Sequence, residues 1–185
     1  MKKRFEFIKK NKNSIEITRK PISDNRGLFE RLFCKKEFKN LIKEKNVVQI
    51  NRAYTKSKAT IRGMHYQVGN TTEDKIVTCL KGRVFDVIID ARKDSKNFLK
   101  WYSCILDSKN NTSSFVPHGF AHGYQTLTNN CELIYFHTDY YDKGASRIIN
   151  CFDPIVNIKW PLKFKLVSKK DMNEKFIKKP LSEYK

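Results

Sequence analysis

Apolar and polar residues alternate in short runs along most of the chain, and this pattern predicts a structure built from strands. Alternation with a period of two indicates a strand that buries one face. On this basis we predict strands at residues 14–18, 47–51, 75–80, 83–90, 101–106, 114–116, 123–128 and 132–138. Turn sequences such as Asp24-Asn25-Arg26-Gly27 and Lys81-Gly82 separate these runs. Many short strands at regular spacing favour an all-β sandwich or barrel.

Helical periodicity is confined to short segments. Residues 35–45 place Phe38, Leu41 and Ile42 on one face, which predicts a short amphipathic helix. The polar segment 168–185 predicts a short helix or an extended arm. No repeat, linker or low-complexity stretch divides the 185 residues. We therefore expect a single domain over 1–185 with its core at about 14–165.

The chain carries a large positive charge. Its 38 Lys and Arg residues against 19 Asp and Glu residues give a net charge of +19, which raises the hypothesis of nucleic-acid binding. The lysines are spread along the chain, however, and no basic motif or aromatic–basic repeat accompanies them. We expect no nucleic-acid partner and no membrane partner. An anionic small molecule such as a sugar nucleotide suits the charge better.

The five cysteines indicate a reducing compartment. They are scattered, odd in number and without a CxxC pair, which is typical of free and mostly buried thiols. The first residues are basic but lack the apolar stretch of a signal peptide. No run reaches the length of a membrane-spanning helix. We expect a cytoplasmic protein.

Two segments place a histidine beside a glycine among the predicted strands. They are Arg-Gly-Met-His-Tyr-Gln at residues 62–67 and Val-Pro-His-Gly-Phe-Ala-His-Gly at residues 116–123. An imidazole titrates near neutral pH and can act as a base, although a single such histidine is more often structural. In a regular strand His65 and Gly63 share one face and Arg62 lies on the other, unless a bulge at Gly63 brings Arg62 to the rim. The pattern leaves open whether His65 points into a barrel or away from it.

Two further residues have a structural and a chemical interpretation. Lys75 opens a predicted strand, where a lysine usually lies in solvent; the alternative is a cation that stabilises an enolate or a phosphate. In the last predicted strand, alternation puts Tyr135, His137 and Asp139 on one face. Tyr135 is then either an aromatic residue packed in the core or a phenolic acid that faces a substrate.

The spacing Pro117-x-Gly119-x-x-His122 is the second motif of cupin barrels, in which this histidine often binds a metal. The proline and glycines predict a tight turn at residues 117–123, with His122 at the start of the next strand. The first cupin metal motif requires HxH and a glutamate, and here Gln67 stands where the second histidine would be. We therefore expect no metal.

Several motifs together are similar to one family. They are Asp24-Asn25-Arg26-Gly27-Leu28-Phe29-Glu30, the segment 62–67, Gly82-Arg83-Val84-Phe85-Asp86-Val87, the Pro-His-Gly-Phe-Ala-His-Gly turn, Asp139-Tyr140-Tyr141, Ile158-Lys159-Trp160-Pro161 and Ser168-Lys169-Lys170-Asp171. In their order, spacing and extent they make the chain resemble the dTDP-4-dehydrorhamnose 3,5-epimerase family almost from end to end. Such proteins are cupin-type β-barrels, also described as a double-stranded β-helix or jelly roll, with short peripheral helices.

The resemblance implies an isomerase that uses no metal and no cofactor. It would invert C3 and C5 of a nucleoside-diphosphate 4-keto-6-deoxy sugar for a surface polysaccharide such as capsule or lipopolysaccharide. His65, polarised by Asp171, resembles the base that removes the protons. Tyr135 resembles the acid that returns them from the opposite face of the ring, and Lys75 would stabilise the enolate oxygen at C4.

The same resemblance implies how the substrate is held. Arg26 and Arg62 are similar to ligands of the diphosphate, which a planar guanidinium can grip through two oxygens. The segment with Arg26 and Glu30 would be lent by a neighbouring subunit, which implies a homodimer. The remaining positions similar to substrate-contacting or pocket residues are Gln49, Asn51, His122 and Tyr141.

Some positions depart from the family pattern. Phe136 stands where a lysine or another polar residue is frequent, and His137 stands where a small residue is common. These changes leave the base and the acid in place. They leave open whether the nucleotide is dTDP or GDP and whether the sugar is a hexose or a heptose. The alternatives are a C3-only epimerase, a 3,4-ketoisomerase, or a non-catalytic barrel that binds sugars or nucleic acid.

Overall fold

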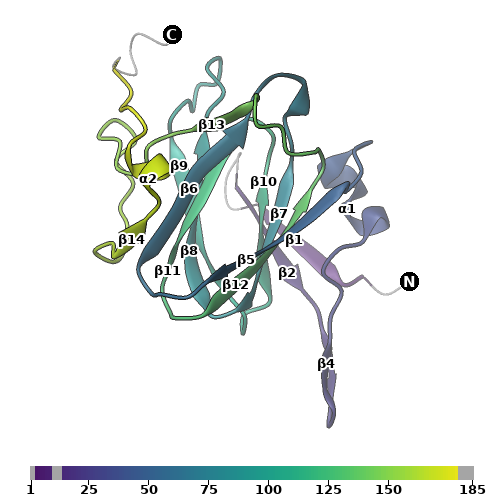
Figure 1. The fold of residues 1–185 in the computed structure, drawn as a ribbon. Coiled ribbons are helices and arrows are strands. Elements are labelled where there is room, and N and C mark those ends of the chain that lie inside the picture. Colours follow the sequence, from purple (N-terminus) through teal and green to yellow (C-terminus); the bar gives the residue numbers. More distant parts are fainter. Residues whose placement is uncertain (1–2, 10–13, 179–185) are drawn as a thin grey trace.

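Two antiparallel sheets face each other and form a barrel in the computed structural model, which describes residues 3–9 and 14–178 (Figure 1). The first sheet contains, in order, β1 (Phe5–Lys9), β2 (Ile15–Arg19), β10 (Thr112–Val116), β7 (Lys75–Lys81), β12 (Cys131–His137) and β5 (Gln49–Thr55). The second contains β13 (Ser146–Ile148), β6 (Thr60–Gln67), β11 (Phe120–Thr126), β8 (Arg83–Asp90) and β9 (Trp101–Asp107), with β14 (Leu166–Val167) parallel to β6. The predicted all-β, cupin-type barrel is confirmed.

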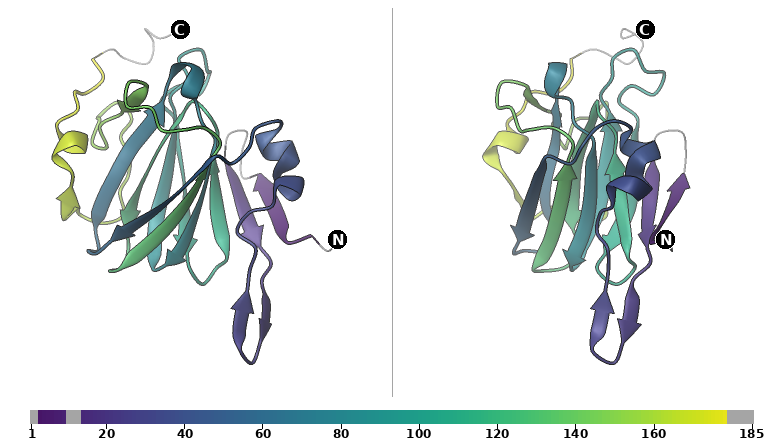
Figure 2. Two further views of the ribbon diagram at one scale, coloured as in Figure 1. Left: turned by 45° about the vertical axis from the view of Figure 1, so that its right-hand side comes forward. Right: turned by 90° about the vertical axis from the view of Figure 1, so that its right-hand side faces the viewer.

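The peripheral elements are short. They are the hairpin of β3 (Ile22–Asp24) and β4 (Gly27–Phe29), the helices α1 (Lys35–Ile42) and α2 (Lys169–Met172), and a 3-10 turn η1 (Gly69–Thr71). The hairpin projects beyond the barrel in both views of Figure 2. In the described part of the chain no helix is long and apolar enough to cross a membrane.

Strand alternation distributes the apolar side chains between the inside and the outside of the barrel. Val77 and Leu133 belong to the cluster that fills the interior between the two sheets. Ile76, which precedes Val77, points to the opposite face of the sheet, and so does its cross-strand partner Phe136. Both belong to a second cluster that packs against Phe38 of α1. One helix therefore covers the outer face of the first sheet, and Phe136 points away from the interior.

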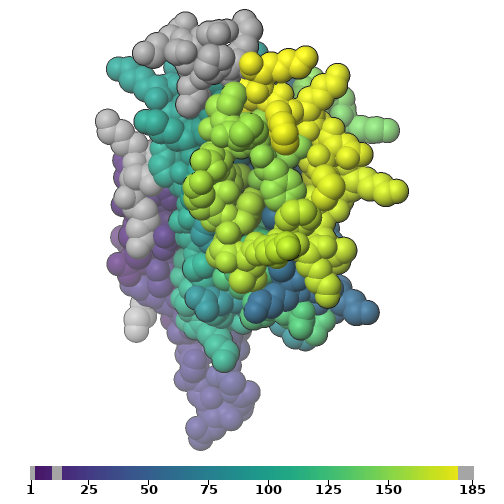
Figure 3. Space-filling view, turned by 90° about the vertical axis from the view of Figure 1, so that its left-hand side faces the viewer, coloured from purple at the N-terminus to yellow at the C-terminus, as the bar shows by residue number. Residues whose placement is uncertain are grey.

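The outer face of the second sheet is covered by the C-terminal third of the chain. Met64 of β6 and Ile89 of β8 pack with Ile149 and Val156 in a third cluster. Figure 3 shows this green-to-yellow segment lying across the side of the barrel. Each fully buried aliphatic side chain stabilises the fold by about 1.5–3 kcal/mol relative to exposure. This layer also carries the chain from β13 to α2.

Each of the predicted strands corresponds to an observed one, and the differences lie at their ends. The strand predicted to start at residue 123 begins at Phe120, so His122 lies within β11 and the prediction that it opens the strand was wrong. The helix ends at Ile42, before the predicted residue 45, because Lys43 has a positive φ of 53°. The predicted C-terminal arm contains α2, and its residues 179–185 lie outside the described residues.

β6 and β11 approach each other closely where Gly63 faces Gly123. A Cβ at Gly63 would lie 2.5 Å from the Gly123 Cα and 2.7 Å from the His122 carbonyl oxygen. Gly63 also has a φ of +124°, which residues with a side chain rarely adopt. The register between the two strands shifts here, between His122 and Tyr124. This is the irregularity that the sequence suggested at Gly63.

We predict that Gly123→Ala destabilises the protein by about 1–3 kcal/mol, because overpacking at such a contact forces the strands apart. Its Cβ would lie 2.6 Å from both the Arg62 carbonyl oxygen and the Met64 sulfur. The control is Gly144→Ala, whose Cβ would meet only a side-chain oxygen of Asp142 at 3.3 Å. Urea unfolding measures both, and equal midpoints for the two variants would contradict the close contact.

Candidate active site

A cavity of about 470 Å³ opens between the two sheets. Strands β6 and β11 line it from one sheet, and β5, β7 and β12 line it from the other. Most of the predicted site residues line this cavity: Gln49, Asn51, Arg62, His65, Lys75, His122, Tyr135 and Tyr141. The barrel thus brings together residues that are widely separated in the sequence.

His65 is held by a buried carboxylate. Its Nε2 lies 2.7 Å from Oδ1 of Asp171, and the Asp171 side chain is only 5% exposed. An ionised carboxylate can only accept, so Nε2 carries the hydrogen and Nδ1 keeps its lone pair. Burial alone would raise the pKa of the Asp171 carboxyl, but hydrogen bonding and charge from His65 lower it below its ordinary value. This arrangement leaves Nδ1 of His65, a residue that lines the cavity, as the ring nitrogen that can accept a proton.

Asp171 reaches His65 from the far end of the chain. The parallel pairing of β14 with β6 brings the segment alongside the strand that carries His65. Ser168 caps α2 by accepting a hydrogen bond of 3.0 Å from the Asp171 backbone N–H. The second oxygen of Asp171 accepts from the Gly63 backbone N–H at 3.4 Å. The one-turn helix α2 thus holds the Asp171 carboxylate against Nε2 of the His65 ring.

Tyr135 lies on the opposite wall, on β12. Its ring packs edge-on against His122 and stacks on His137, with a centroid separation of 6.0 Å in each case. Burial raises the pKa of the Tyr135 phenol, and the nearby Tyr124 and Asp86 raise it further, well above the ordinary value. Tyr135 therefore keeps its proton at neutral pH and can donate it to an anionic carbon. This supports the interpretation of Tyr135 as an acid.

His122 forms a second imidazole–carboxylate pair inside the barrel. Its Nε2 lies 2.6 Å from Oδ1 of Asp86 on β8, and the two side chains are 5% and 1% exposed. The second oxygen of Asp86 is buried without a hydrogen-bond partner among the described residues. His122 therefore lines the cavity with its ring orientation fixed by Asp86.

Lys75 lies in the cavity wall and is only 8% exposed, so of its two interpretations the solvent-exposed one is wrong. Its ammonium is 3.0 Å from Oε1 of Glu73. The other oxygen of Glu73 lies 2.5 Å from Nδ1 of His137, whose Nε2 is 3.2 Å from the amide nitrogen of Asn51. Lys75 thus brings a cation to the wall that also carries Tyr135.

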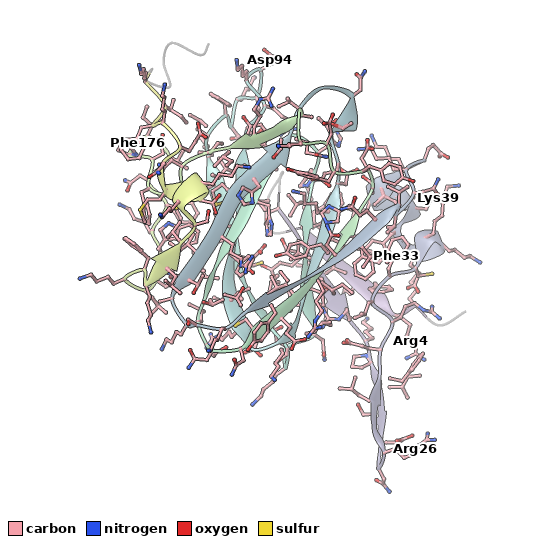
Figure 4. The ribbon with its side chains drawn as sticks, in the orientation of Figure 1. Arg4, Arg26, Phe33, Lys39, Asp94 and Phe176 are labelled. Carbon is pink, nitrogen blue, oxygen red and sulfur yellow. The ribbon has the colours of Figure 1, made fainter. Side chains whose placement is uncertain are left out.

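The hairpin residues do not reach the cavity of their own chain. Arg26 lies at the tip of the hairpin, where Figure 4 shows it far from the barrel. Its side chain is 89% exposed and pairs with Asp24 at 2.5 Å. Glu30 instead pairs at 2.8 Å with Arg19, the last residue of β2, whose side chain is 2% exposed. Within one subunit these two residues are therefore separate from the site.

Strict alternation of side chains fails at two positions, and at Arg62 the alternative with an irregularity at Gly63 is the one observed. Arg62 and His65 both line the cavity, although a regular strand would place them on opposite faces. The shifted register beside Gly63 accounts for this. β12 ends at His137, so Asp139 lies beyond the strand and does not line the cavity with Tyr135.

Sequence reasoning missed two acidic residues of the site. Glu73 lies two positions before Lys75, so extending the alternation of β7 backwards would have placed both side chains on one face. Asp86 interrupts the apolar run of β8, and an acidic residue in the middle of a buried strand indicates a partner. The partners, His137 and His122, lie on other strands and were not predictable from local pattern.

The geometry allows proton transfer on two sides of a bound ligand. A basic nitrogen faces the cavity from β6, and a protonated phenol and an ammonium face it from the other sheet. Removal of a proton on one face and its return on the other inverts a carbon centre. Among the described residues no group of three His, Cys, Asp or Glu side chains is arranged to hold a metal ion. The fold and site define a barrel of the acid–base isomerase class.

Comparison with known proteins gives the family. The chain matches the dTDP-4-dehydrorhamnose 3,5-epimerase family over residues 10–179. It is 38% identical to the dTDP-4-dehydrorhamnose 3,5-epimerase of Shigella flexneri over 160 residues, which cover 85% of this chain and 88% of that protein. The chain belongs to the dTDP-4-dehydrorhamnose 3,5-epimerase family, and it is an isomerase of the epimerase type.

Solved structures agree with this assignment. The dTDP-6-deoxy-D-glucose-3,5-epimerase RmlC of Legionella pneumophila, in complex with dTDP-4-keto-L-rhamnose, is 34% identical. It has a TM-score of 0.87, with 93% of this chain and 92% of that chain covered. The dTDP-4-dehydrorhamnose 3,5-epimerase of Bacillus anthracis, with TDP and PPi bound, is 30% identical at a TM-score of 0.88, with 94% and 99% covered.

The His65–Asp171 pair predicts a pH-dependent contribution to stability. The pKa of Asp171 is lowered in the folded state, so the pair stabilises the fold fully above the unfolded pKa of about 3.9 and ceases to do so as the pH falls below it. We expect the difference in unfolding free energy between the protein and Asp171→Asn to be largest near pH 7 and to shrink below about pH 4. Denaturant titrations at several pH values measure it.

The matched control for this prediction is Asp94→Asn, which changes an exposed aspartate outside the cavity. It should leave the unfolding free energy within about 0.5 kcal/mol of the parent protein at each pH. A constant difference for Asp171→Asn from pH 7 to pH 3 would mean that the carboxylate charge does not stabilise the pair.

Proposed function

We propose that this protein inverts C3 and C5 of a dTDP-linked 4-keto-6-deoxy sugar of the 4-dehydro-6-deoxyglucose type. The observation that carries the proposal is the placement of His65 and Tyr135 on opposite sheets around one cavity. The epimerases of Shigella flexneri and Legionella pneumophila support the substrate class by their names and by the dTDP-4-keto-L-rhamnose bound to the latter.

The chemistry follows from the ketone at C4. It acidifies the adjacent C–H bonds, so Nδ1 of His65 takes the proton and the electron pair moves onto the C4 oxygen as an enolate. Asp171 stabilises the imidazolium that forms, and Lys75 stabilises the enolate oxygen. Tyr135 then gives its proton to the same carbon from the opposite face, and the C4 ketone re-forms. Before the second centre reacts, His65 releases its proton to solvent and the Tyr135 phenolate takes one up, which restores the base and the acid. The same two transfers then invert the second centre.

The substrate is held along the cavity and by a second subunit. Arg62 binds the diphosphate at the cavity, and Gln49, Asn51, His122 and Tyr141 contact the sugar nucleotide or shape its pocket. In a homodimer, the hairpin would bring Arg26 to the neighbouring cavity. The apolar side chains of the hairpin support this, since Leu28 is 62% and Phe29 is 71% exposed in the single chain.

The cellular setting is part of the same proposal. Five free cysteines suit the reducing cytoplasm, where nucleotide sugars are made. The 4-keto product would pass to a reductase and then into a surface polysaccharide. Neither a metal nor a cofactor takes part, since the ketone of the substrate itself provides the acidity.

We expect the protein to exchange both C3–H and C5–H of dTDP-4-keto-6-deoxyglucose for deuterium in D2O, as followed by NMR. His65→Ala should lower this exchange by about 10³-fold or more, because it removes the imidazole that Asp171 holds at the cavity as the base. Tyr135→Phe should still exchange protons but invert the centres about 10²–10⁴-fold more slowly, because the returning acid is gone.

The control is His118→Ala, which removes an imidazole paired with Asp74 at 2.9 Å but outside the cavity. It should retain the exchange rate. Exchange at C3 alone would redefine the enzyme as a C3-epimerase or, if the carbonyl moves, a 3,4-ketoisomerase. A preference for GDP-linked sugars would correct the nucleotide, and full activity of His65→Ala would refute the assigned base.

A shared site predicts complementation between two inactive variants. Arg26→Ala removes the residue lent to the neighbour, and His65→Ala removes the base of the chain's own cavity. Random mixing of the two chains should restore about a quarter of the wild-type sites, because half of the dimers are mixed and each has one intact site. Steady-state assays of the refolded mixture measure this. No recovery in confirmed mixed dimers would place Arg26 outside the site.

A further inference from the structure

Beyond the base and the acid, one wall of the cavity holds a chain of hydrogen-bonded polar side chains. Lys75 contacts Glu73 at 3.0 Å, Glu73 contacts His137 at 2.5 Å, and His137 contacts Asn51 at 3.2 Å. All four residues line the cavity. Lys75 opens β7 and Glu73 lies two residues before it, whereas His137 ends β12 and Asn51 belongs to β5.

The direction of these hydrogen bonds is fixed by the amide. The Nδ2 of Asn51 can only donate, so Nε2 of His137 must accept and carries no hydrogen. The hydrogen of the neutral ring is therefore on Nδ1, where it is donated to Glu73. Burial would raise the pKa of the Glu73 carboxyl, but His137 and the Lys75 ammonium lower it below its ordinary value. Glu73 is thus ionised and can accept the hydrogen bond from Nδ1 of His137.

The chain of hydrogen bonds ends at the oxygen of the Asn51 amide. Because Nδ2 of the planar amide is bound to His137, the amide oxygen points away from His137. Within the described residues this oxygen accepts no hydrogen bond, although Asn51 lines the cavity. Asn51 and Tyr135 are directly paired neighbours on β5 and β12, so their side chains line the cavity next to each other.

We propose that Glu73 and His137 are positioning residues that fix the Asn51 amide with its oxygen toward the bound sugar, so that the site selects a sugar with a hydroxyl donor at that place. This inference rests on the proposed function for the identity of the ligand. Without Glu73 and His137, the Asn51 amide can rotate by about 180°. It would then present its N–H groups to a sugar hydroxyl as often as its oxygen. The pair therefore determines substrate binding, and the proton transfers remain with His65 and Tyr135.

A double-mutant cycle tests whether His137 acts through Asn51. His137→Phe removes the acceptor but keeps an aromatic ring to stack on Tyr135, which His137 contacts at 27° between ring planes. We expect it to raise KM for dTDP-4-keto-6-deoxyglucose by about 3–10-fold with kcat little changed, as for the loss of one hydrogen bond. Asn51→Leu should have a similar effect.

The double variant gives the decisive comparison. Once Leu replaces Asn51, adding His137→Phe should raise KM no further, because the two residues act as one unit. Multiplicative effects on KM, or a fall in kcat with KM unchanged, would show that His137 acts independently of Asn51 and would overturn the proposal.

The tautomer of His137 can be measured without any substrate. The chain has four histidines, so ¹⁵N NMR of the labelled imidazoles is tractable and His137→Phe assigns the signal. We expect a neutral ring protonated on Nδ1 at pH 7, and a ring protonated on Nε2 or on both nitrogens would sink the proposal. If the tautomer is as expected but no nucleotide sugar is epimerised, the proposed function fails instead.

Discussion

The site depends on one electrostatic constraint, which is that a carboxylate inside an apolar barrel must be paired. Asp86, Asp171 and Glu73 are each less than a tenth exposed. An unpaired ionised carboxylate in such surroundings costs several kcal/mol. The structure pairs one oxygen of each with an imidazole, and the fourth histidine of the chain, His118, is paired with Asp74 in the same way. Each carboxylate determines which nitrogen of its partner imidazole carries the hydrogen. The pairing that allows a carboxylate to be buried therefore also sets which ring nitrogen can act as a base.

The same constraint explains how one sheet can hold both an apolar core and polar chemistry. Along β7, Ile76 faces α1 while Lys75 and Val77 face the interior. Along β12, Phe136 stacks with Phe33 outside the barrel at 5.9 Å, and Tyr135 and His137 line the cavity. The departure from the family pattern at Phe136 therefore concerns packing on the outer face, whereas the departure at His137 changes the site.

Local sequence pattern predicted the strands well, because alternation depends only on which face of each strand is buried. It also placed Tyr135 and His137 together for that reason. It failed at Lys75, since a strand-opening lysine is buried only when a carboxylate such as Glu73 neutralises it. At Arg62 the pattern left two alternatives, and the close approach of Gly63 and Gly123 interrupts the alternation as the second alternative required. The hydrogen-bonded pairs were beyond local pattern altogether: His65 and Asp171 are 106 residues apart, and Glu73 and His137 are 64 apart. The resemblance to a family supplied the first pair and gave no indication of the second.

The delivery of Asp171 by a one-turn helix has a consequence for biosynthesis. The barrel strands precede this helix in the chain, so the nascent protein can assemble its sheets while His65 still lacks its carboxylate. A chain that ended before Ser168 would contain every strand but lack the carboxylate that contacts His65. The order of translation thus makes acquisition of the base one of the last events in maturation, and it couples full reactivity to completion of the fold.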